Sequence, residues 1–156
     1  MQPGDRLGRY MLIERIGAGG MGSVWLAKAE GARGFERLVV IKKIHDHLLE
    51  DQMIVDSFVR EARICGHLHH KNIVQAIEFS DEQGFYLVME YVDGPTVHEL
   101  IREARSRGQT IPLAIALEIV EQVCEGLDYA HSAVSTEGKL LSVVHRDIKP
   151  KNLLID

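Results

Sequence analysis

The stretch VVHRDIKPKNLLID, from Val143 to Asp156, decides how the rest of this chain is interpreted. It places a histidine, an arginine, two lysines, an aspartate and an asparagine between apolar residues, a mixture typical of chemistry on a charged substrate. Its core fits the pattern H-R-D-x-K-x-x-N. Five fixed positions occur by chance in a chain of this length about once in twenty thousand sequences. The segment is therefore a specific functional signal.

Composition limits the class of protein. The chain has 156 residues, 46% of them apolar and 26% charged, with a net charge of −5, which is a globular balance. The sequence contains no basic stripe, which argues against nucleic acid as the main partner. No apolar run of about 18 residues predicts a membrane segment, and MQPGDRLGRY lacks the apolar core of a signal peptide. Cys65 and Cys124 form no paired motif, so we expect buried thiols in the cytoplasm.

The first part of the chain has the alternation of strands, interrupted by one helix. Apolar residues at helical spacing predict a helix from Ile54 to Leu68, with Phe58 and Cys65 on its apolar stripe. The expected strands are Tyr10 to Ile16, Ser23 to Ala29, Arg37 to Ile44, Ile73 to Phe79 and Phe85 to Tyr91.

The remainder is predicted to be helical after a short link from Val92 to Pro95. Thr96 followed by Glu99 indicates a capping box, and Gly108 a helix stop. A second helix is expected near Thr110, with Pro112 in its first turn. Its apolar face comprises Leu113, Leu117, Val120, Cys124 and Leu127.

The glycines Gly17, Gly19 and Gly22 form GxGxxG, which lets backbone amides approach a phosphate. A dinucleotide site would need a helix after the glycines and an acidic residue about 20 positions later. Here a strand follows, and Lys42 stands at that distance. The dinucleotide interpretation is therefore rejected.

Strand alternation places Lys42 and Lys43 on opposite faces, so one of them points inward and needs an anion. Glu61 lies on the apolar stripe of the predicted helix, where an unpaired charge is costly. A pair between Lys42 and Glu61, both on buried faces, is the favoured interpretation. A solvated lysine and a glutamate reaching water are the alternatives.

In order along the chain, these motifs resemble the protein kinases, in particular bacterial kinases of the eukaryotic serine/threonine type. The matching segments are the glycine loop with Val24, VVIK ending at Lys42, REA around Glu61, HKNIV from His70, MEYVDG from Met89, and HRDIKPKN.

The resemblance implies an α+β, bilobal fold with two parts. Residues 1–92 would be the small lobe, a five-stranded antiparallel sheet plus one helix, and residues 93–156 the hinge exit and the start of the large lobe. It implies that the chain ends before the DFG motif, so that this segment alone is expected to be inactive and the apolar face of its last helix uncovered.

The resemblance also implies roles for individual residues, with ATP and Mg²⁺ as cofactors and a protein serine or threonine as acceptor. Asp147 would orient the hydroxyl, Lys149 would steady the γ-phosphate, and Asn152 would bind Mg²⁺. Lys42, paired with Glu61, would hold the α- and β-phosphates. Nucleotide contacts are implied for Ile16, Gly17, Ala18, Gly19, Gly20, Met21, Gly22, Val24, Val40, Lys42, Met89, Glu90, Val92 and Asn152.

The chemistry of the residues agrees with these roles. Phosphoryl transfer needs a positioned hydroxyl and cations beside the developing charge. Asp147 and Lys149 project to one side of an extended loop, and the neutral oxygen of Asn152 suits Mg²⁺.

Two other functions remain open at this stage. One is a non-catalytic nucleotide-binding or interaction module, and the other is a kinase-like phosphotransferase for small molecules. The histidines of HLHH could also be taken for a metal site, but no carboxylate or cysteine completes it. The chain departs from the family at Val40, at Lys71 and in a longer segment from Ser132 to Ser142, expected to be a surface hairpin.

Overall fold

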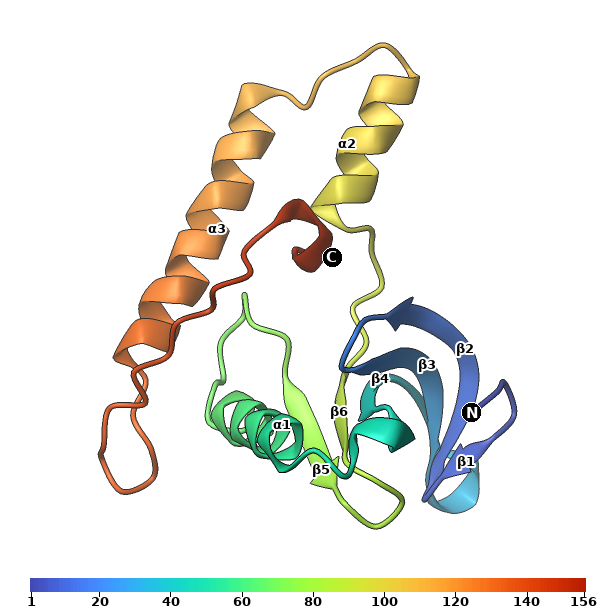
Figure 1. Cartoon of the computed structure of the whole chain (residues 1–156). Helices are drawn as coiled ribbons and strands as arrows, with labels where there is room; N and C mark the ends of the chain where they lie inside the picture. Colours follow the sequence, from blue (N-terminus) through green and yellow to red (C-terminus); the bar gives the residue numbers. More distant parts are fainter. The chain divides into compact units, whose positions relative to one another are not determined.

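A six-stranded antiparallel sheet dominates the first part of the chain (Figure 1). The structure is a computed structural model that describes all 156 residues. The strand order across the sheet is β1-β2-β3-β4-β6-β5. The strands are β1 Arg6–Leu7, β2 Tyr10–Ala18, β3 Gly22–Glu30, β4 Glu36–Ile44, β5 Ala76–Ser80 and β6 Tyr86–Glu90. Five were expected, so the five-stranded prediction is wrong by the short strand β1, which is too brief to leave a period in the sequence.

The chain divides into two compact units. The first comprises Met1–Leu68 and Gln75–Tyr91, and the second comprises His69–Val74 and Val92–Asp156. A short piece between helix α1, Gln52–Cys65, and β5 therefore belongs with the later helices. The division expected at residue 92 does not anticipate this exchange.

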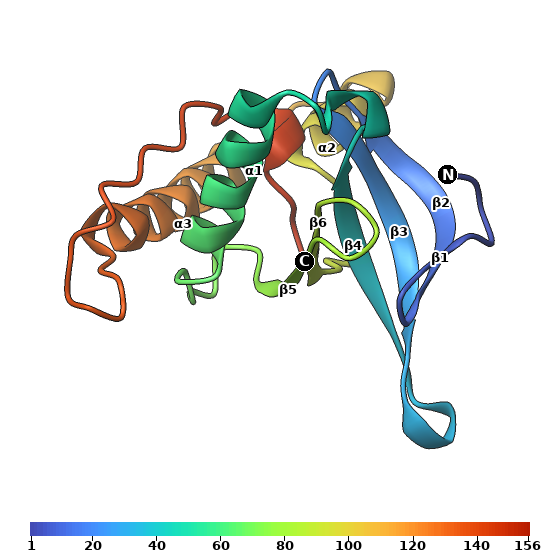
Figure 2. The ribbon, with the colours of Figure 1, turned by 60° about the horizontal axis from the view of Figure 1, so that its bottom comes forward.

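The sheet of the first unit is curled. The Tyr10 hydroxyl of β2 donates a hydrogen bond of 2.7 Å to Glu78 of β5, although three other strands lie between them. Figure 2 shows the twist of β2, β3 and β4, with the turn between β3 and β4 projecting from the sheet. This turn contains the short 3-10 helix η1, Ala32–Gly34. The core inside the curl consists of Leu7, Tyr10, Leu12, Trp25, Ala27, Val39, Ile41, Tyr86 and Val88.

Alternation along β4 decides which lysine is buried. Val39, Ile41 and Lys43 share the core face, and Lys43 is 4% exposed. Lys43 pairs with Asp46 in the 3-10 helix η2, Asp46–Leu48. Lys42 lies on the other face with its side chain 31% exposed. The expectation that Lys42 is the inward lysine is therefore wrong. The more tightly packed face of β4 is the one that carries Val39, Ile41 and Lys43.

Helix α1, Gln52–Cys65, covers the second face of the sheet. The Asp51 carboxylate caps it by accepting hydrogen bonds from the first-turn amides. The helix buries Val55, Phe58 and Ala62, so its apolar face is rotated from the predicted stripe and only Phe58 is common to both. The predicted end at Leu68 is three residues too late, because the chain leaves the helix at Gly66.

The second unit contains two α-helices, between which the chain reverses direction (Figure 1). Helix α2, Val97–Ser106, begins with the predicted capping box of Thr96 and Glu99. Gly108 follows it with a φ of 67°, a conformation that favours glycine. Helix α3, Leu113–Ser132, is longer and begins after Pro112, which occupies the N-cap rather than the first turn.

The predicted apolar face of α3 is largely exposed. Leu113, Leu117 and Val120 are 74%, 59% and 58% exposed, as expected for a face without a cover in this segment. The residues that α3 buries are the small Gly126 and Ala130. A Cβ added to Gly126 would lie 3.2 Å from the Asn72 carbonyl. The segment 69–74 therefore packs closely on α3.

Other contacts fix this segment and the C-terminal one. The His70 ring stacks on Tyr129 with centroids 5.0 Å apart. Separately, the structure contains no group of three or more histidine, cysteine, aspartate or glutamate residues that could hold a metal ion. Val134 pairs with Leu140, so the segment after α3 folds as the expected hairpin. No helix of the structure combines the length and the apolar character needed to cross a membrane.

Candidate active site

The predicted site residues fall into two groups, one in each unit. The glycine-rich turn, Lys42, Glu61, Met89 and Glu90 belong to the first unit, and the catalytic-loop residues and Val92 belong to the second. Each group has a geometry of its own.

The glycine-rich turn joins β2 to β3. The surroundings of its glycines differ, so glycine is present at each position for a different reason. A Cβ added to Gly22 would lie 2.2 Å from the Lys43 carbonyl oxygen, so the protein itself requires glycine there. A Cβ added to Gly19 or Gly20 would meet nothing within 4 Å. The tip of the turn therefore has open backbone, which suits the approach of phosphate oxygens to its amides.

Strand register aligns the side chains expected to surround adenine. Val40 of β4 lies opposite Leu26 of β3 on one side and Met89 of β6 on the other. Val24 lies opposite Lys42. Residues paired in this way project from the same face. Val24, Val40 and Met89 are half-buried, so they form an apolar surface beside the lysine. Ile16 and Met21 flank the turn with 50% and 48% exposure.

Lys42 and Glu61 form the predicted ion pair. Lys42 Nζ lies 2.6 Å from Glu61 Oε1 and 5.7 Å from the centroid of the Phe58 ring. The glutamate side chain is 48% exposed, so it does not occupy the buried stripe assigned to it. Pairs as exposed as this contribute little to stability. Their effect here is to hold the ammonium group in one place.

The end of β6 shows which main-chain groups are already used. The Glu90 amide donates to the Gln75 carbonyl at 3.0 Å, and the Glu90 carboxylate accepts from the Gln75 amide at 2.6 Å. The Glu90 amide is thus already engaged within the protein. The sequence did not indicate this role of Gln75.

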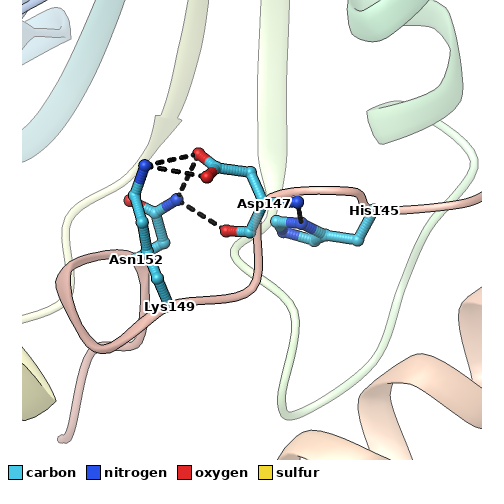
Figure 3. Close-up of polar contacts among 4 residues, drawn as sticks. All are labelled: His145, Asp147, Lys149 and Asn152. Atoms are coloured by element: carbon cyan, nitrogen blue, oxygen red, sulfur yellow. Dashed lines mark hydrogen bonds and ion pairs between the residues drawn. The ribbon is translucent and has the colours of Figure 1, made fainter.

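The catalytic-loop residues of the second unit form a connected cluster (Figure 3). Lys149 Nζ donates to both carboxylate oxygens of Asp147, at 2.8 and 2.9 Å. The Asn152 side-chain amide donates to the Asp147 carboxylate at 2.8 Å and to its carbonyl at 2.9 Å. The Asp147 amide donates to His145 Nδ1 at 3.2 Å. Asp147 and Lys149 therefore lie on one side of the loop, as predicted.

These contacts keep Asp147 ionised. The hydrogen bond from Lys149 is the main cause that lowers the pKa of the Asp147 carboxyl, and that from Asn152 is the next. The loop reaches this arrangement through Arg146, whose φ of 62° is unusual for a residue with a side chain. Because the amide nitrogen of Asn152 is engaged by Asp147, its Oδ1 is the atom that can face a cation.

The C-terminal segment anchors this loop. The 3-10 helix η3, Pro150–Asn152, is followed by a short antiparallel pairing with the residues before α2. The Val97 amide donates to the Leu153 carbonyl at 2.8 Å, and the Ile155 amide donates to the Pro95 carbonyl at 3.0 Å. A Cβ on Gly94 would lie 1.7 Å from the Ile155 oxygen. This close approach explains the glycine of the MEYVDG motif.

Sequence reasoning missed the contacts of Phe58, Gln75 and His145. Phe58 was assigned to the apolar stripe of the helix. The sequence around it does not indicate that its ring lies close to the Lys42 ammonium group. His145 was recognised only as part of a motif. Asp147, two residues after His145, was the signal that could have suggested a local hydrogen bond.

The family model of the protein kinase domain matches residues 10–156. The chain therefore belongs to the protein kinase family. It is similar to the crystal structure of the PknI kinase domain of Mycobacterium tuberculosis, with a TM-score of 0.72, 25% identity, and coverage of 99% of this chain and 58% of that one. The α+β fold of a kinase small lobe followed by the start of a large lobe is confirmed.

Two curated relatives differ in the acceptor that their names state. The chain is 40% identical over 149 residues to the tyrosine-protein kinase MasK of Myxococcus xanthus, covering 95% of this chain and 23% of that protein. It is 37% identical over 150 residues to the serine/threonine-protein kinase PrkC of Bacillus subtilis, covering 96% of this chain and 21% of that protein. The chain thus spans less than a quarter of the length of these relatives.

Proposed function

We propose that this chain provides the nucleotide-binding part and the catalytic loop of a kinase that transfers phosphate from ATP to serine or threonine hydroxyls of proteins. The single observation that carries the proposal is the cluster in which Lys149 and Asn152 both bind the ionised carboxylate of Asp147. A carboxylate beside an ammonium group serves a hydroxyl and a phosphate together. We place this activity in the cytoplasm, where ATP is available.

The first unit would bind the nucleotide. Lys42, held by Glu61, directs an ammonium group toward the α- and β-phosphates, and the exposed turn at Gly19 and Gly20 offers amides to phosphate oxygens. Adenine would lie against the apolar surface of Val24, Val40 and Met89. The further nucleotide contacts that we propose are Ile16, Gly17, Ala18, Met21, Gly22, the Glu90 carbonyl and the Val92 main chain.

The second unit would act on the acceptor. The Asp147 carboxylate accepts the hydrogen bond of the incoming hydroxyl and orients its oxygen toward the γ-phosphorus. Lys149 leaves one carboxylate oxygen for the γ-phosphate, where it offsets negative charge as the bond to the β-phosphate breaks. Mg²⁺ bound to the phosphates supplies charge neutralisation. Asn152 Oδ1 is the residue atom that we propose for it.

The acceptor class rests on Lys149. A lysine two residues after the catalytic aspartate resembles the serine/threonine kinases, and PrkC carries that specificity in its name. The name of MasK states tyrosine instead. Serine and threonine have shorter side chains than tyrosine. Their hydroxyl groups reach less far, so the γ-phosphate has to lie close to Asp147. Lys149, which donates to Asp147, would hold it there.

The first experiment measures nucleotide binding by titration calorimetry with MgATP. Lys42→Met should weaken ATP binding about tenfold or more, because an ammonium group on phosphate makes a charge-assisted contact. Lys151→Met is the matched control, since Lys151 is exposed and close to Asn152 in sequence. Lys43 is unsuitable as a control because it is buried and ion-paired.

The second experiment follows transfer from γ-labelled ATP in the full-length protein, with peptides that differ only in serine, threonine or tyrosine. Asp147→Asn should reduce transfer about 10²–10⁴-fold without weakening ATP binding. Label on tyrosine alone would contradict the acceptor class. Binding of ATP without transfer would favour the nucleotide-binding module, and label on a small molecule but on no peptide would favour the second alternative.

A further inference from the structure

The turn between β2 and β3 is held from the end of β4 by one residue, His45. Its main-chain amide donates to the Met21 carbonyl at 3.2 Å. Its ring nitrogen Nε2 lies 3.1 Å from the Gly19 carbonyl oxygen. His45 therefore contacts the turn at two points, three residues after Lys42.

The chemistry of the contact defines the state of the ring. A carbonyl oxygen only accepts hydrogen bonds, so Nε2 carries the proton and donates. The ring stacks on His47, with centroids 5.4 Å apart and planes 14° from parallel. Both the neutral Nε2–H tautomer and the imidazolium ion can donate in this way. The contact therefore fastens the Gly19 carbonyl in one direction.

Fixing the Gly19 carbonyl also fixes the amide that follows it. In a trans peptide the carbonyl of Gly19 and the N–H of Gly20 point in opposite directions within one plane. With the carbonyl turned to His45, the Gly20 N–H is turned away from it. That amide makes no hydrogen bond within the protein, and the space around Gly20 is open. It is therefore a donor with a defined direction and no partner.

We propose that His45 is a positioning residue for the nucleotide phosphates, acting by holding the Gly19–Gly20 peptide so that its amide faces a phosphate oxygen. The inference rests on the proposed nucleotide site. Two successive glycines impose few steric limits on this peptide. Without the ring, the peptide can rotate and present its carbonyl dipole, which repels a phosphate. The contact from β4 removes that freedom before the nucleotide arrives.

The test compares the affinities for ATP and for adenosine. His45→Leu should weaken ATP binding about three- to tenfold, the effect of one hydrogen bond, and leave adenosine binding unchanged. His45→Gln keeps an N–H donor and should restore most of the ATP affinity. His98→Leu, at an exposed position on α2, is the control for loss of a histidine. Equal weakening of ATP and adenosine would indicate a purely structural role and overturn the proposal.

A second measurement does not depend on nucleotide. Amide relaxation by NMR on the 156-residue chain should show order parameters for Gly19 and Gly20 near those of rigid backbone, about 0.85, falling below about 0.6 in His45→Leu. Unchanged order would refute the fastening by His45 even if ATP binds. If the wild-type chain bound no ATP but lost loop order in His45→Leu, the proposed function would fail while the fastening stood, and the phosphate role would be rejected with it.

Discussion

Gly22 and Gly20 stand two residues apart in the same turn. Alanine at position 22 should lower the stability of the fold, whereas alanine at position 20 should leave it nearly unchanged. At Gly22 the added Cβ would lie 2.2 Å from the Lys43 carbonyl oxygen and 3.0 Å from its carbonyl carbon. Contacts below 3.0 Å essentially never occur for a Cβ, so β3 must move by most of an ångström. At Gly20 the new methyl group meets nothing within 4 Å, and the residue does not have a positive φ.

The magnitude follows from the pairing that the shift disturbs. Gly22 lies opposite Ile44, and Ser23 lies opposite Lys43. Loss of about two ladder hydrogen bonds, each contributing about 0.5–1.5 kcal/mol, predicts a decrease of about 1–3 kcal/mol in the free energy of unfolding for Gly22→Ala. Gly20→Ala should change it by about 0.5 kcal/mol or less. The Tm should fall by about 4–8 °C for each kcal/mol in a unit of this size.

The two assays are thermal unfolding and MgATP titration on the same preparations. Gly22→Ala should lower the Tm. Gly20→Ala should retain the Tm but weaken ATP binding, because its methyl group enters the space proposed for phosphate. A stable Gly22→Ala variant would mean that the strand end yields to the methyl group at no cost, and the steric reasoning would be refuted. Unchanged ATP affinity in Gly20→Ala would remove the phosphate from this turn.

Three further outcomes are expected. Glu61→Gln should weaken ATP binding several-fold with little change in the Tm, because the exposed pair orients Lys42 and contributes little to stability; calorimetry and thermal unfolding separate the two effects. Lys149→Met should raise the pKa of Asp147 toward its ordinary value in a carbon-detected NMR titration, because the lysine is the main cause of the lowered pKa. The lowered pKa means that the ionised form persists to a more acidic pH in the folded chain, so a titration unchanged by Lys149→Met would show that the contact does not exist in solution. Gly94→Ala should destabilise the second unit and disturb the catalytic-loop cluster, because the Cβ would lie 1.7 Å from a carbonyl oxygen; amide chemical shifts identical to wild type in that loop would contradict it.

Local chemistry made several features predictable from the sequence. The capping box of Thr96 and Glu99 depends on two side chains and the amides beside them, and it was predicted correctly. The same is true of the stop at Gly108, where a positive φ favours glycine. Asp147 and Lys149 could be placed on one side of the loop because side chains alternate along an extended chain. These predictions needed no knowledge of distant contacts.

Burial could not be obtained in this way. Alternation along β4 separates Lys42 from Lys43, but both faces of the sheet are covered, and the sequence does not say which cover is tighter. The face inside the curl is completely packed, so Lys43 became the buried lysine. Likewise the stripe of α1 was rotated, because Phe58 and Ala62 pack on the sheet while the Glu61 side chain remains half-exposed.

The sequence by itself determined the family, the order of strands and helices, and the identity of the chemical groups, since these depend on local periodicity and on motifs at fixed spacing. Only the tertiary structure decided three other features. It requires glycine at positions 22 and 94, it leaves Lys42 partly exposed in a pair with Glu61, and it brings His45 against the glycine-rich turn. Each of these depends on backbone or side chains brought together from segments distant in sequence. Such contacts form when strands pair and the chain turns back on itself, and no local pattern records them.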